Sequence, residues 1–435
     1  MKVVVVGAGY VGVCTGIALA ELGHDVRFAD VDAAKVDALR RHVAPFREPG
    51  VDEALARLAI PATVDVAGAV RGADVVILCV GTPSTREGEV DLGALEAASR
   101  AVGEALAGRS DFPVVAVKST VLPGTTRSVV APIVAGGSGL VPGTTVGVGS
   151  NPEFLAEGTA LRDARAPDRI VVGADDPRTA ERLLALYAKL DRPKVAVSTE
   201  TAELAKYASN AFLAARVALA DEVANLARAV GGDSVEVLRL VGLDARIGPH
   251  YLRAGAGFGG SCFPKDLSAL SGELKRRGLP AHVVDALLAH NDRQPVEVVR
   301  IVEAGLGGLR GRRVAILGLA FKAGTDDVRE SRAFPIAREL LARGATVIAY
   351  DPLATRAFLD FAPHVDGAPT AAAALADADA AVLQTEDPMW RELGPASFAA
   401  LRAKLVVDGR RSFRAEEFEG TGVRYAAVGL GEPAA

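Results

Sequence analysis

Cysteine is scarce in this chain, and its scarcity excludes two classes of protein. Only Cys14, Cys79 and Cys262 occur among 435 residues, widely separated and without a Cys-x-x-Cys pair. Small disulfide-stapled scaffolds and zinc modules need closely spaced cysteines, so neither a disulfide framework nor a metal site is expected. Cys14 and Cys79 fall in an apolar helix start and an apolar strand, where packing is the expected role.

A surplus of positive charge is also missing. The formal net charge of −5 gives no basic surface for nucleic acid. Half of the residues are apolar, which is ample for burial. The length exceeds that of one ordinary core and predicts two or three domains.

Long uncharged runs are few. Residues 3–20 carry no charge and follow Lys2, as a signal peptide or membrane span would. The glycines within this run and the charged strand and helix pattern after it favour instead a soluble, cytoplasmic protein without a membrane partner.

That N-terminal run is a β-branched strand that leads into Gly7-x-Gly9-x-x-Gly12 and an apolar helix. In this pattern the first glycine permits the turn, the second lets the backbone approach a pyrophosphate, and the third lets the helix pack on the strand. The next strand ends at Asp30, at the spacing of a carboxylate that binds the adenosine ribose. Because a carboxylate repels a 2′-phosphate, the sequence predicts NAD rather than NADP.

Further apolar runs at 75–80 and 114–117 alternate with helical segments, which predicts a parallel, doubly wound sheet. Ligands bind where such strands end, so Ser84 and Thr120 are expected either to meet the cofactor or substrate or to cap turns. A similar pattern begins near Gly311, but Gly318 stands alone there and Lys322 follows, so a different phosphate-bearing ligand is expected. Residues 411–435 read as peripheral.

A long, proline-free helix is predicted from Glu200 to Val230, linking two lobes or pairing two subunits. Lys206 and Asn210 lie one turn apart on it, either to hold an oxyanion in a cleft or as solvated surface residues. Glu153 and Glu157 are four residues apart, after the apparent last strand of the first lobe, and indicate acid-base chemistry on a short helix.

The segment from Phe258 to Asp266, Phe-Gly-Gly-Ser-Cys-Phe-Pro-Lys-Asp, places Cys262 between a glycine-rich loop and a lysine. A cysteine attacks as the thiolate, which positive charge or aligned N–H groups stabilise. Lys265 is placed to supply that charge, and the glycines leave room for a bulky polar ligand. A buried structural cysteine is the alternative for a cysteine taken alone.

Together these motifs resemble the UDP-glucose/GDP-mannose dehydrogenase family, nearly end to end. They are GxGYVG at 7–12, Gly-Thr-Pro at 81–83, STVxPGT at 119–125, NPEFLxEG at 151–158, PDRIV at 167–171, ExxKYxxN at 203–210, FGGSCFPKD at 258–266, and GLAFK with TDDxRES at 318–331.

The resemblance implies two Rossmann-like doubly wound α/β domains joined by a long central helix. It implies an NAD-binding domain at 1–198, a central dimerisation and active-site domain at 199–305, and a UDP-sugar domain at 306–435. It also implies oxidation of a sugar C6 alcohol to a carboxylate with two NAD molecules, through a thiohemiacetal and thioester on Cys262, by a homodimer.

By the same resemblance, the catalytic residues are Cys262, Lys206, Asn210, Asp266, Thr120, Glu157 and Glu153. The NAD-binding residues are Gly7, Gly9, Tyr10, Val11, Gly12, Asp30, Lys35, Ser84, Thr120, Glu157, Lys265 and Arg329. The UDP-sugar residues are Glu153, Phe154, Leu155, Ala156, Glu157, Lys206, Asn210, Tyr251, Leu252, Arg253, Ala254, Gly255, Gly259, Lys322 and Arg410.

The chain departs from the family pattern at three positions. The family usually has arginine at Ala156, proline at Arg332 and asparagine at Arg411. None of these removes a catalytic group, although Ala156 lies between the two carboxylates and bears on substrate contacts. UDP-glucose is the expected substrate, with GDP-mannose or a UDP-N-acetylhexosamine as the alternatives, and a non-catalytic binding protein as the alternative from another class.

Overall fold

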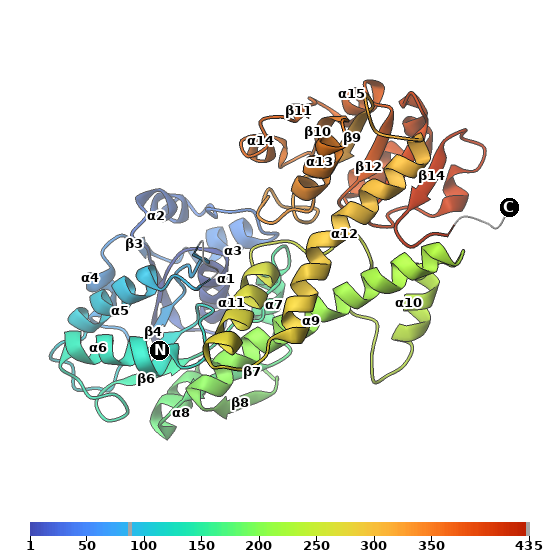
Figure 1. Cartoon of the computed structure of the whole chain (residues 1–435). Coiled ribbons are helices and arrows are strands. Elements are labelled where there is room, and N and C mark those ends of the chain that lie inside the picture. Colours follow the sequence, from blue (N-terminus) through green and yellow to red (C-terminus); the bar gives the residue numbers. More distant parts are fainter. Residues whose placement is uncertain (86–88, 432–435) are drawn as a thin grey trace. The chain divides into compact units, whose positions relative to one another are not determined.

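The computed structural model describes residues 1–85 and 89–431 of the chain (Figure 1). The chain divides into two compact units, residues 1–209 and residues 210–435. The division falls inside helix α9 (Thr199–Ala229), so that this one helix contributes residues to both units. Across the described ranges, no helix combines the length and the apolar character that crossing a membrane requires.

An eight-stranded sheet is the centre of the first unit, in the order β3-β2-β1-β4-β5-β6-β7-β8. The β6–β7 pair is antiparallel and the other neighbours are parallel. The strands are β1 (Lys2–Val6), β2 (Asp25–Ala29), β3 (Ala62–Thr63), β4 (Val75–Leu78), β5 (Val114–Val117), β6 (Gly147–Ser150), β7 (Ile170–Ala174) and β8 (Lys194–Val197).

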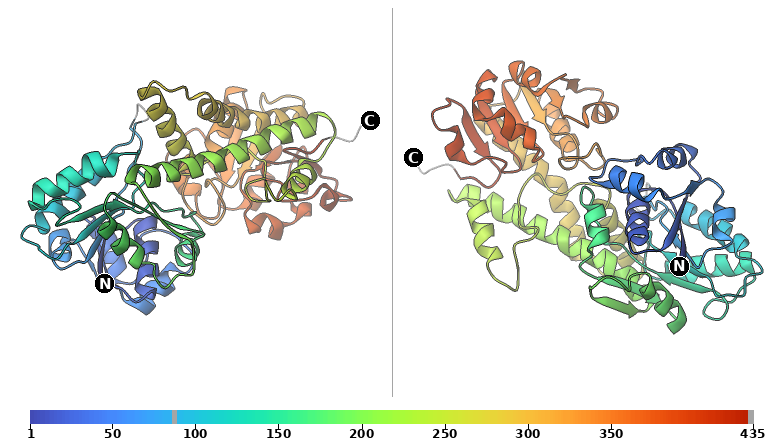
Figure 2. Two further views of the ribbon diagram at one scale, coloured as in Figure 1. Left: turned by 90° about the horizontal axis from the view of Figure 1, so that it is seen from below. Right: turned by 180° about the vertical axis from the view of Figure 1, so that it is seen from behind.

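Helices cover both faces of this sheet (Figure 2). Alternate side chains of β1 show why: Val3 and Val5 join one hydrophobic cluster, whereas Val4 and Val6 join another. A strand buried on both faces must be apolar throughout, as the valine run is. The helices are α1 (Tyr10–Glu21), α2 (Ala33–Arg40), α3 (Val51–Leu58), α4 (Val66–Val70), α5 (Gly93–Ala105), π-helical η1 (Thr126–Val130), α6 (Ala131–Ser138), α7 (Ala160–Arg165) and α8 (Pro177–Ala185).

The second unit contains a six-stranded sheet in the order β11-β10-β9-β12-β13-β14. All of its neighbouring strands are parallel. The strands are β9 (Arg313–Leu317), β10 (Thr346–Tyr350), β11 (Asp366–Gly367), β12 (Ala380–Leu383), β13 (Leu405–Asp408) and β14 (Arg424–Ala427). This order repeats that of the first six strands of the other sheet, which is the Rossmann order.

Both faces of the second sheet are also buried. Val314 and Ile316 belong to one hydrophobic cluster and Ala315 and Leu317 to another. The helices of this unit, besides the C-terminal part of α9, are α10 (Ser234–Gly242), α11 (Phe263–Arg276), α12 (His282–Leu306), α13 (Ala333–Ala342), α14 (Thr355–Leu359), α15 (Ala371–Ala376), α16 (Pro388–Leu393), and the short 3-10 helices η2 (Pro395–Ala400) and η3 (Ala415–Phe418). The predicted fold class, two Rossmann-like α/β domains with a long central helix, is confirmed.

Three local predictions are wrong. The segment that carries Glu153 does not follow the last strand of its sheet, because β7 and β8 come after it. Residues 151–156 form no helix, because Glu153 turns its carboxylate back onto the N–H of Leu155, and such local bonds compete with helix formation. Residues 411–435 are not peripheral in their described part: β14 pairs with β13, and Phe413 and Phe418 are buried in the core.

Candidate active site

The glycine-rich turn after β1 has the geometry that a dinucleotide requires. Gly7 has φ +105°, a conformation that favours glycine. A Cβ on Gly12 would lie 1.9 Å from the carbonyl oxygen of Gly7, so the helix packs closely on the turn, whereas a Cβ on Gly9 would meet nothing within 4 Å. The open side of the turn at Gly9 leaves space for a pyrophosphate beside the N-terminus of α1.

Asp30 completes this pocket. Its carboxylate accepts hydrogen bonds from the backbone N–H of Ala8 at 2.6 Å and of Asp32 at 2.9 Å, and Lys35 Nζ lies 4.0 Å away. The carboxylate is therefore fixed beside the glycine turn with lone pairs left to accept from ribose hydroxyls. The residues present fit NAD, and they oppose the extra phosphate of NADP.

Two other predicted NAD residues lie near this turn. Tyr10 stacks on Phe46, with ring centroids 4.0 Å apart, and its hydroxyl donates to the carbonyl of Arg47 at 2.9 Å. Val11, on the first turn of α1, is partly buried. Ser84 forms an isolated bridge with Val90, next to residues 86–88, which lie outside the described ranges.

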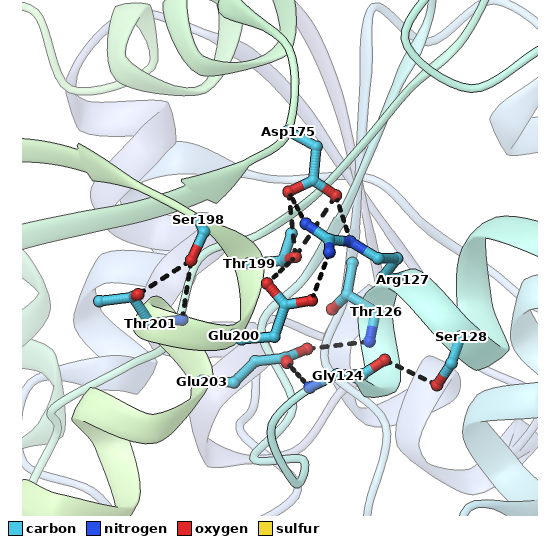
Figure 3. Close-up of polar contacts among 10 residues, drawn as sticks. All are labelled: Gly124, Thr126, Arg127, Ser128, Asp175, Ser198, Thr199, Glu200, Thr201 and Glu203. Carbon is cyan, nitrogen blue, oxygen red and sulfur yellow. Dashed lines mark hydrogen bonds and ion pairs between the residues drawn. The ribbon is translucent and has the colours of Figure 1, made fainter.

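The loop that contains Thr120 is held by α9. The buried Glu203 carboxylate accepts from the N–H of Gly124 at 2.6 Å and from that of Thr126 at 2.9 Å (Figure 3). Burial raises the pKa of Glu203, and these hydrogen bonds oppose the rise. Thr82 adds a bond from its hydroxyl to the Thr120 carbonyl at 2.7 Å.

Arg127 forms a second connection between the same elements. Its guanidinium pairs with Asp175 at 2.6 Å and with Glu200 of α9 at 3.0 Å (Figure 3). All three side chains are partly exposed, so these pairs contribute less than the buried Glu203 contacts.

Glu153 and Lys206 form a buried ion pair in the first unit. Lys206 Nζ lies 2.8 Å from Glu153 Oε1, with side-chain exposures of only 4% and 7%. Burial raises the pKa of Glu153, but the ammonium of Lys206 and the N–H of Leu155 outweigh burial and hold the pKa below its usual value. Glu153 is therefore an anion at neutral pH. The interpretation of Lys206 as a solvated surface residue is wrong.

The neighbouring Asn151 is fixed from three sides. Its side-chain oxygen accepts from Lys118 at 3.1 Å and Tyr187 at 2.6 Å, and its amide donates to the Val171 carbonyl at 2.8 Å. The guanidinium carbon of Arg169 lies over the ring of Phe154, 3.8 Å from the ring centroid. The 151–158 segment, including Leu155 and Glu157, is therefore a shaped loop fastened to the sheet.

In the second unit, Asp266 receives two side-chain donors. Asn210 Nδ2 donates to one of its oxygens at 2.6 Å and Lys265 Nζ to the other at 2.6 Å. Asp266 and Asn210 are buried, so Asn210 is not a surface residue either. Cys262 caps the N-terminus of α11, accepts the N–H of Asp266 on its carbonyl, and is exposed.

The N-terminus of α11 explains the order of this motif. Pro264 stands in the first turn, where the missing N–H costs nothing. The aligned N–H groups of that turn favour negative charge on a thiol at the capping position, whereas the Lys265 ammonium pairs with Asp266 at 2.6 Å. Cys262 is exposed, which excludes the alternative of a buried structural cysteine.

The glycine-rich loop before Cys262 is held by polar side chains. Gly255 donates its N–H to Asp221 at 2.7 Å and accepts from Gln294 at 2.8 Å. Phe258 is bracketed by Asn291, which accepts from its N–H at 2.7 Å and donates to its carbonyl at 3.0 Å. Side chains of α9 and α12 therefore hold the backbone of this loop at Gly255 and Phe258.

The remaining predicted sugar-nucleotide residues lie around this loop or at the second sheet. Arg410, after β13, donates to the carbonyls of Gln384 at 2.9 Å and Gly257 at 3.2 Å. A Cβ on Gly255 would lie 2.7 Å from Arg410 Nη1, and one on Gly259 would lie 2.3 Å from the Glu330 carbonyl oxygen.

Other members of this set are more exposed. Arg253 pairs with Glu386 at 2.5 Å, Tyr251 packs against Phe263 with ring centroids 6.2 Å apart, and the Lys322 ammonium lies 5.6 Å from the ring centroid of Phe321. Leu252 packs on the core cluster to which buried Ala254 belongs. Arg329, expected at NAD, pairs with Asp327 in the second unit.

The three residues that depart from the family pattern, Ala156, Arg332 and Arg411, each form hydrogen bonds in the structure. Ala156 donates its N–H to Asp163 at 3.1 Å, so its backbone is fixed although the side chain is short. Arg332 is buried and donates to the Glu330 carbonyl at 3.1 Å. Arg411 has φ +54°, which suits asparagine better, and forms a bidentate pair with Asp233, both contacts at 2.9 Å.

Sequence reasoning missed the residues that position these loops: Glu203, Asp221, Asn291 and Gln294. A signal was present, because each is a polar residue among apolar residues at helical spacing. On α12, for example, Asn291 continues the buried stripe formed by Val284, Val298 and Val302 at helical spacing. A polar residue there must find a partner inside the protein.

The fold and these residues define an NAD-dependent dehydrogenase with two dinucleotide-type sheets and a cysteine at a helix N-terminus. Comparison with known families agrees with this class. Three domain descriptions of the UDP-glucose/GDP-mannose dehydrogenase family match the chain: the NAD binding domain at residues 1–191, the central domain at 200–293 and the UDP binding domain at 315–415.

Individual proteins are similar over nearly the whole chain. The UDP-glucose 6-dehydrogenase AglM of Haloferax volcanii is 42% identical, over 94% of this chain and 97% of its own. A GDP-mannose 6-dehydrogenase of Pseudomonas putida is 37% identical, over 94% and 95%. The solved UDP-glucose dehydrogenase of Pyrobaculum islandicum has a TM-score of 0.91 and 42% identity, over 99% and 98%. The chain belongs to the UDP-glucose/GDP-mannose dehydrogenase family, and NAD is its cofactor.

Proposed function

We propose that this enzyme oxidises UDP-glucose to UDP-glucuronate in two steps, each of which removes two electrons. The observation that carries this proposal is the exposed Cys262 at the N-terminus of α11, four residues before a buried aspartate that receives hydrogen bonds from Asn210 and Lys265. A simple alcohol dehydrogenase needs no nucleophilic thiol. In an enzyme that carries an alcohol to the acid, a nucleophilic thiol retains the aldehyde by bonding to it.

NAD, when bound, accepts one hydride in each oxidation. In our proposal the ammonium of Lys206 and the amide of Asn210 stabilise negative charge on the substrate oxygen as it develops. Both groups are buried and fixed by carboxylates, Glu153 and Asp266, and their N–H donors cost little to reorganise.

The thiolate of Cys262 adds to the aldehyde carbon and forms a C–S bond, and the resulting oxyanion is protonated to a thiohemiacetal. Loss of the second hydride and of the hydroxyl proton gives a thioester. Water then attacks the carbonyl, the C–S bond breaks, and the thiolate leaves with the acid as product. Thr120, Glu157 and Asp266 are proposed to position and activate that water.

The other predicted contacts belong to the same proposal. The glycine turn, Asp30, Lys35, Ser84, Lys265 and Arg329 are proposed to contact NAD. The 153–157 segment, the 251–255 segment with Gly259, Lys322 and Arg410 are proposed to contact the UDP-sugar. The division into domains at residues 198 and 305 and a cytoplasmic location are proposed as well.

The long helix α9 supports a homodimer. Phe212, Leu219 and Leu226 are 75%, 59% and 64% exposed and are spaced seven residues apart, so they form one apolar stripe. A stripe of that spacing is the pattern of a helix that packs against another helix. We propose that the partner is a second copy of the chain.

The yield of NADH distinguishes the substrates. With purified enzyme and limiting sugar nucleotide, UDP-glucose is expected to give two NADH per molecule, and GDP-mannose and UDP-N-acetylglucosamine little or none. Turnover of GDP-mannose alone would assign the chain to that branch of the family. Binding of NAD and UDP-glucose with no NADH from any sugar nucleotide would favour the non-catalytic alternative.

A further inference from the structure

A buried carboxylate behind the 251–260 loop has no assigned task in the reaction. Asp221 lies on α9 with no exposed surface, and its Oδ1 accepts the N–H of Gly255 at 2.7 Å. The carbonyl of Gly255 accepts a hydrogen bond from the side-chain amide of Gln294. The side-chain oxygen of Gln294 in turn accepts from Asn225 of α9 at 2.9 Å. Both sides of the Gly255 peptide are therefore held by α9 and α12, which are labelled in Figure 1.

The second oxygen of Asp221 is unsatisfied. Among the described residues Oδ2 has no hydrogen-bond partner, and the same is true of Nε2 of His290 on α12, which lies 4.0 Å from it. A buried carboxylate with one bare oxygen is costly as an anion. Two facing groups of this kind, one acid and one base, are a natural place for a single proton.

His290 lies between Oδ2 of Asp221 and the solvent. Its side chain is 18% exposed and lines a surface cavity of about 460 Å³ together with Asn225 and Gln294. The imidazole thus lies between solvent and the Asp221 carboxylate, and a rotation that closes the 4.0 Å separation would let a proton pass between them. The charged or titratable groups around the pair are Arg410 from the turn after β13, Glu222 on α9, and Arg293 and Glu297 on α12.

Arg410 links the pair to the nucleotide sugar. It interacts electrostatically with Asp221 and donates to the carbonyl of Gly257, two residues from the clamped peptide. An ionised Asp221 offsets the positive charge of Arg410, whereas a protonated Asp221 leaves that charge available for an anionic ligand.

We propose that Asp221 is a positioning residue whose proton, exchanged through His290, makes the binding of the nucleotide sugar pH-dependent. This inference rests on the proposed function, because it takes Arg410 and the 251–255 segment as the UDP-sugar site. The ligand diphosphate disfavours the Asp221 anion, so by linkage the protonated enzyme binds UDP-glucose more tightly.

The titration falls in a measurable range. Burial raises the pKa of Asp221 to about 7, against the opposing effects of the Gly255 N–H and Arg410, and burial lowers that of His290. UDP-glucose itself keeps its diphosphate charge unchanged across this range, so a change in affinity reports on the protein.

Calorimetric titration of the full chain with UDP-glucose, without NAD so that no turnover occurs, tests the proposal. For the native chain, Kd is expected to be about 3–10-fold lower near pH 6 than near pH 8. Asp221→Asn keeps an oxygen for the Gly255 N–H but cannot ionise, so its Kd should stay low at both pH values. Asp221→Ala removes the acceptor and should weaken binding at both.

Glu222→Gln is the matched control, because it removes a neighbouring carboxylate of the same cavity that has no contact with Gly255; it should keep the native pH dependence. A pH-independent Kd in the native chain, or an unchanged dependence in Asp221→Asn, would overturn the inference. Failure of the proposed function looks different: UDP-glucose would then not bind at any pH or would yield no NADH.

Discussion

The surroundings of the three cysteines separate one thiol from the other two. Burial raises the pKa of Cys14 and of Cys79, the latter to about 12, so both remain protonated and inert at neutral pH. Cys262 is exposed at the start of α11. The sequence could single it out as the predicted nucleophile because a glycine-rich loop, a cysteine and a helix start are all local features, and this role stays a prediction.

Replacement of Cys262 by serine tests the covalent route. A serine hydroxyl is a much poorer nucleophile than a thiolate, and its ester is hydrolysed more slowly than a thioester, so net UDP-glucuronate formation should fall by at least about 10³-fold. Steady-state NADH production measures this, with mass spectrometry of the intact chain to detect a trapped ester. Cys79→Ser is the control, because it makes the same substitution at a buried thiol that has no proposed role in the reaction, and it should keep activity. Native activity in Cys262→Ser would refute the thioester.

Asp221 also makes a prediction about stability. Its pKa is raised in the folded chain, so the folded state binds its proton more tightly than the unfolded state does, and the stability gained this way is lost as pH rises from about 4 to about 7. Asp221→Asn removes the cost of the buried anion above that range. We expect its unfolding temperature near pH 8 to exceed that of the native chain by about 2–4 °C, and the gap to shrink near pH 5. An equal gap at both pH values would show that ionisation is not the cause.

At the scale of elements, helix α9 carries several side chains that hold the loops of the candidate site. Glu203 of α9 holds the 119–126 segment through the backbone N–H groups of Gly124 and Thr126, and Lys206, one turn later, binds Glu153. Both carboxylate oxygens of Glu203 are used. A glutamine in its place would turn an NH₂ group toward an N–H donor.

Glu203→Gln should therefore destabilise the first unit by about 1–3 kcal/mol. It should also weaken activity, because the loop that carries Thr120 loses its attachment to α9. Glu200→Gln is the matched control one turn earlier: it loses a partly exposed pair with Arg127 and should cost less than about 1 kcal/mol. Thermal unfolding of the two variants measures the difference. Equal losses would show that burial of Glu203 does not matter.

Some elements could be predicted from the sequence, and others could not. Strands β1 and β9 were predictable because a strand buried on both faces has no choice but an apolar run. The loop at 151–156 was mistaken for a helix, because spacing alone cannot show that Glu153 bonds its own backbone. The polar residues Asp221 and Asn291 were overlooked because their partners, Gly255 and Phe258, are more than thirty residues away in the chain.

For the whole molecule, the two sheets repeat one strand order, and the sequence predicted this repeat from the second strand and glycine pattern that begins near Gly311. The structure deepens the likeness. Asp351 accepts the N–H of Leu319 at 2.7 Å, as Asp30 accepts that of Ala8 at 2.6 Å. The extent of the sheets was not predicted, since β7, β8 and β14 are strands of only four or five residues.

The exposed apolar stripe on α9 predicts that the whole molecule assembles as a dimer. The stripe of Phe212, Leu219 and Leu226 leaves apolar side chains in water at a cost that packing against a second copy removes. The double substitution Leu219→Glu with Leu226→Glu places two charges on that stripe and should weaken a dimer at least about 100-fold.

Sedimentation should show the native chain at twice its 44.8 kDa mass and the double variant at the mass of one chain. Val195→Glu is the control, because Val195 is an exposed apolar residue on β8 that does not belong to the α9 stripe, and its substitution should leave the dimer intact. A native chain that sediments as one copy at micromolar concentration would contradict the dimer. Dissociation by Val195→Glu as well would show that added charge, rather than the α9 stripe, is responsible.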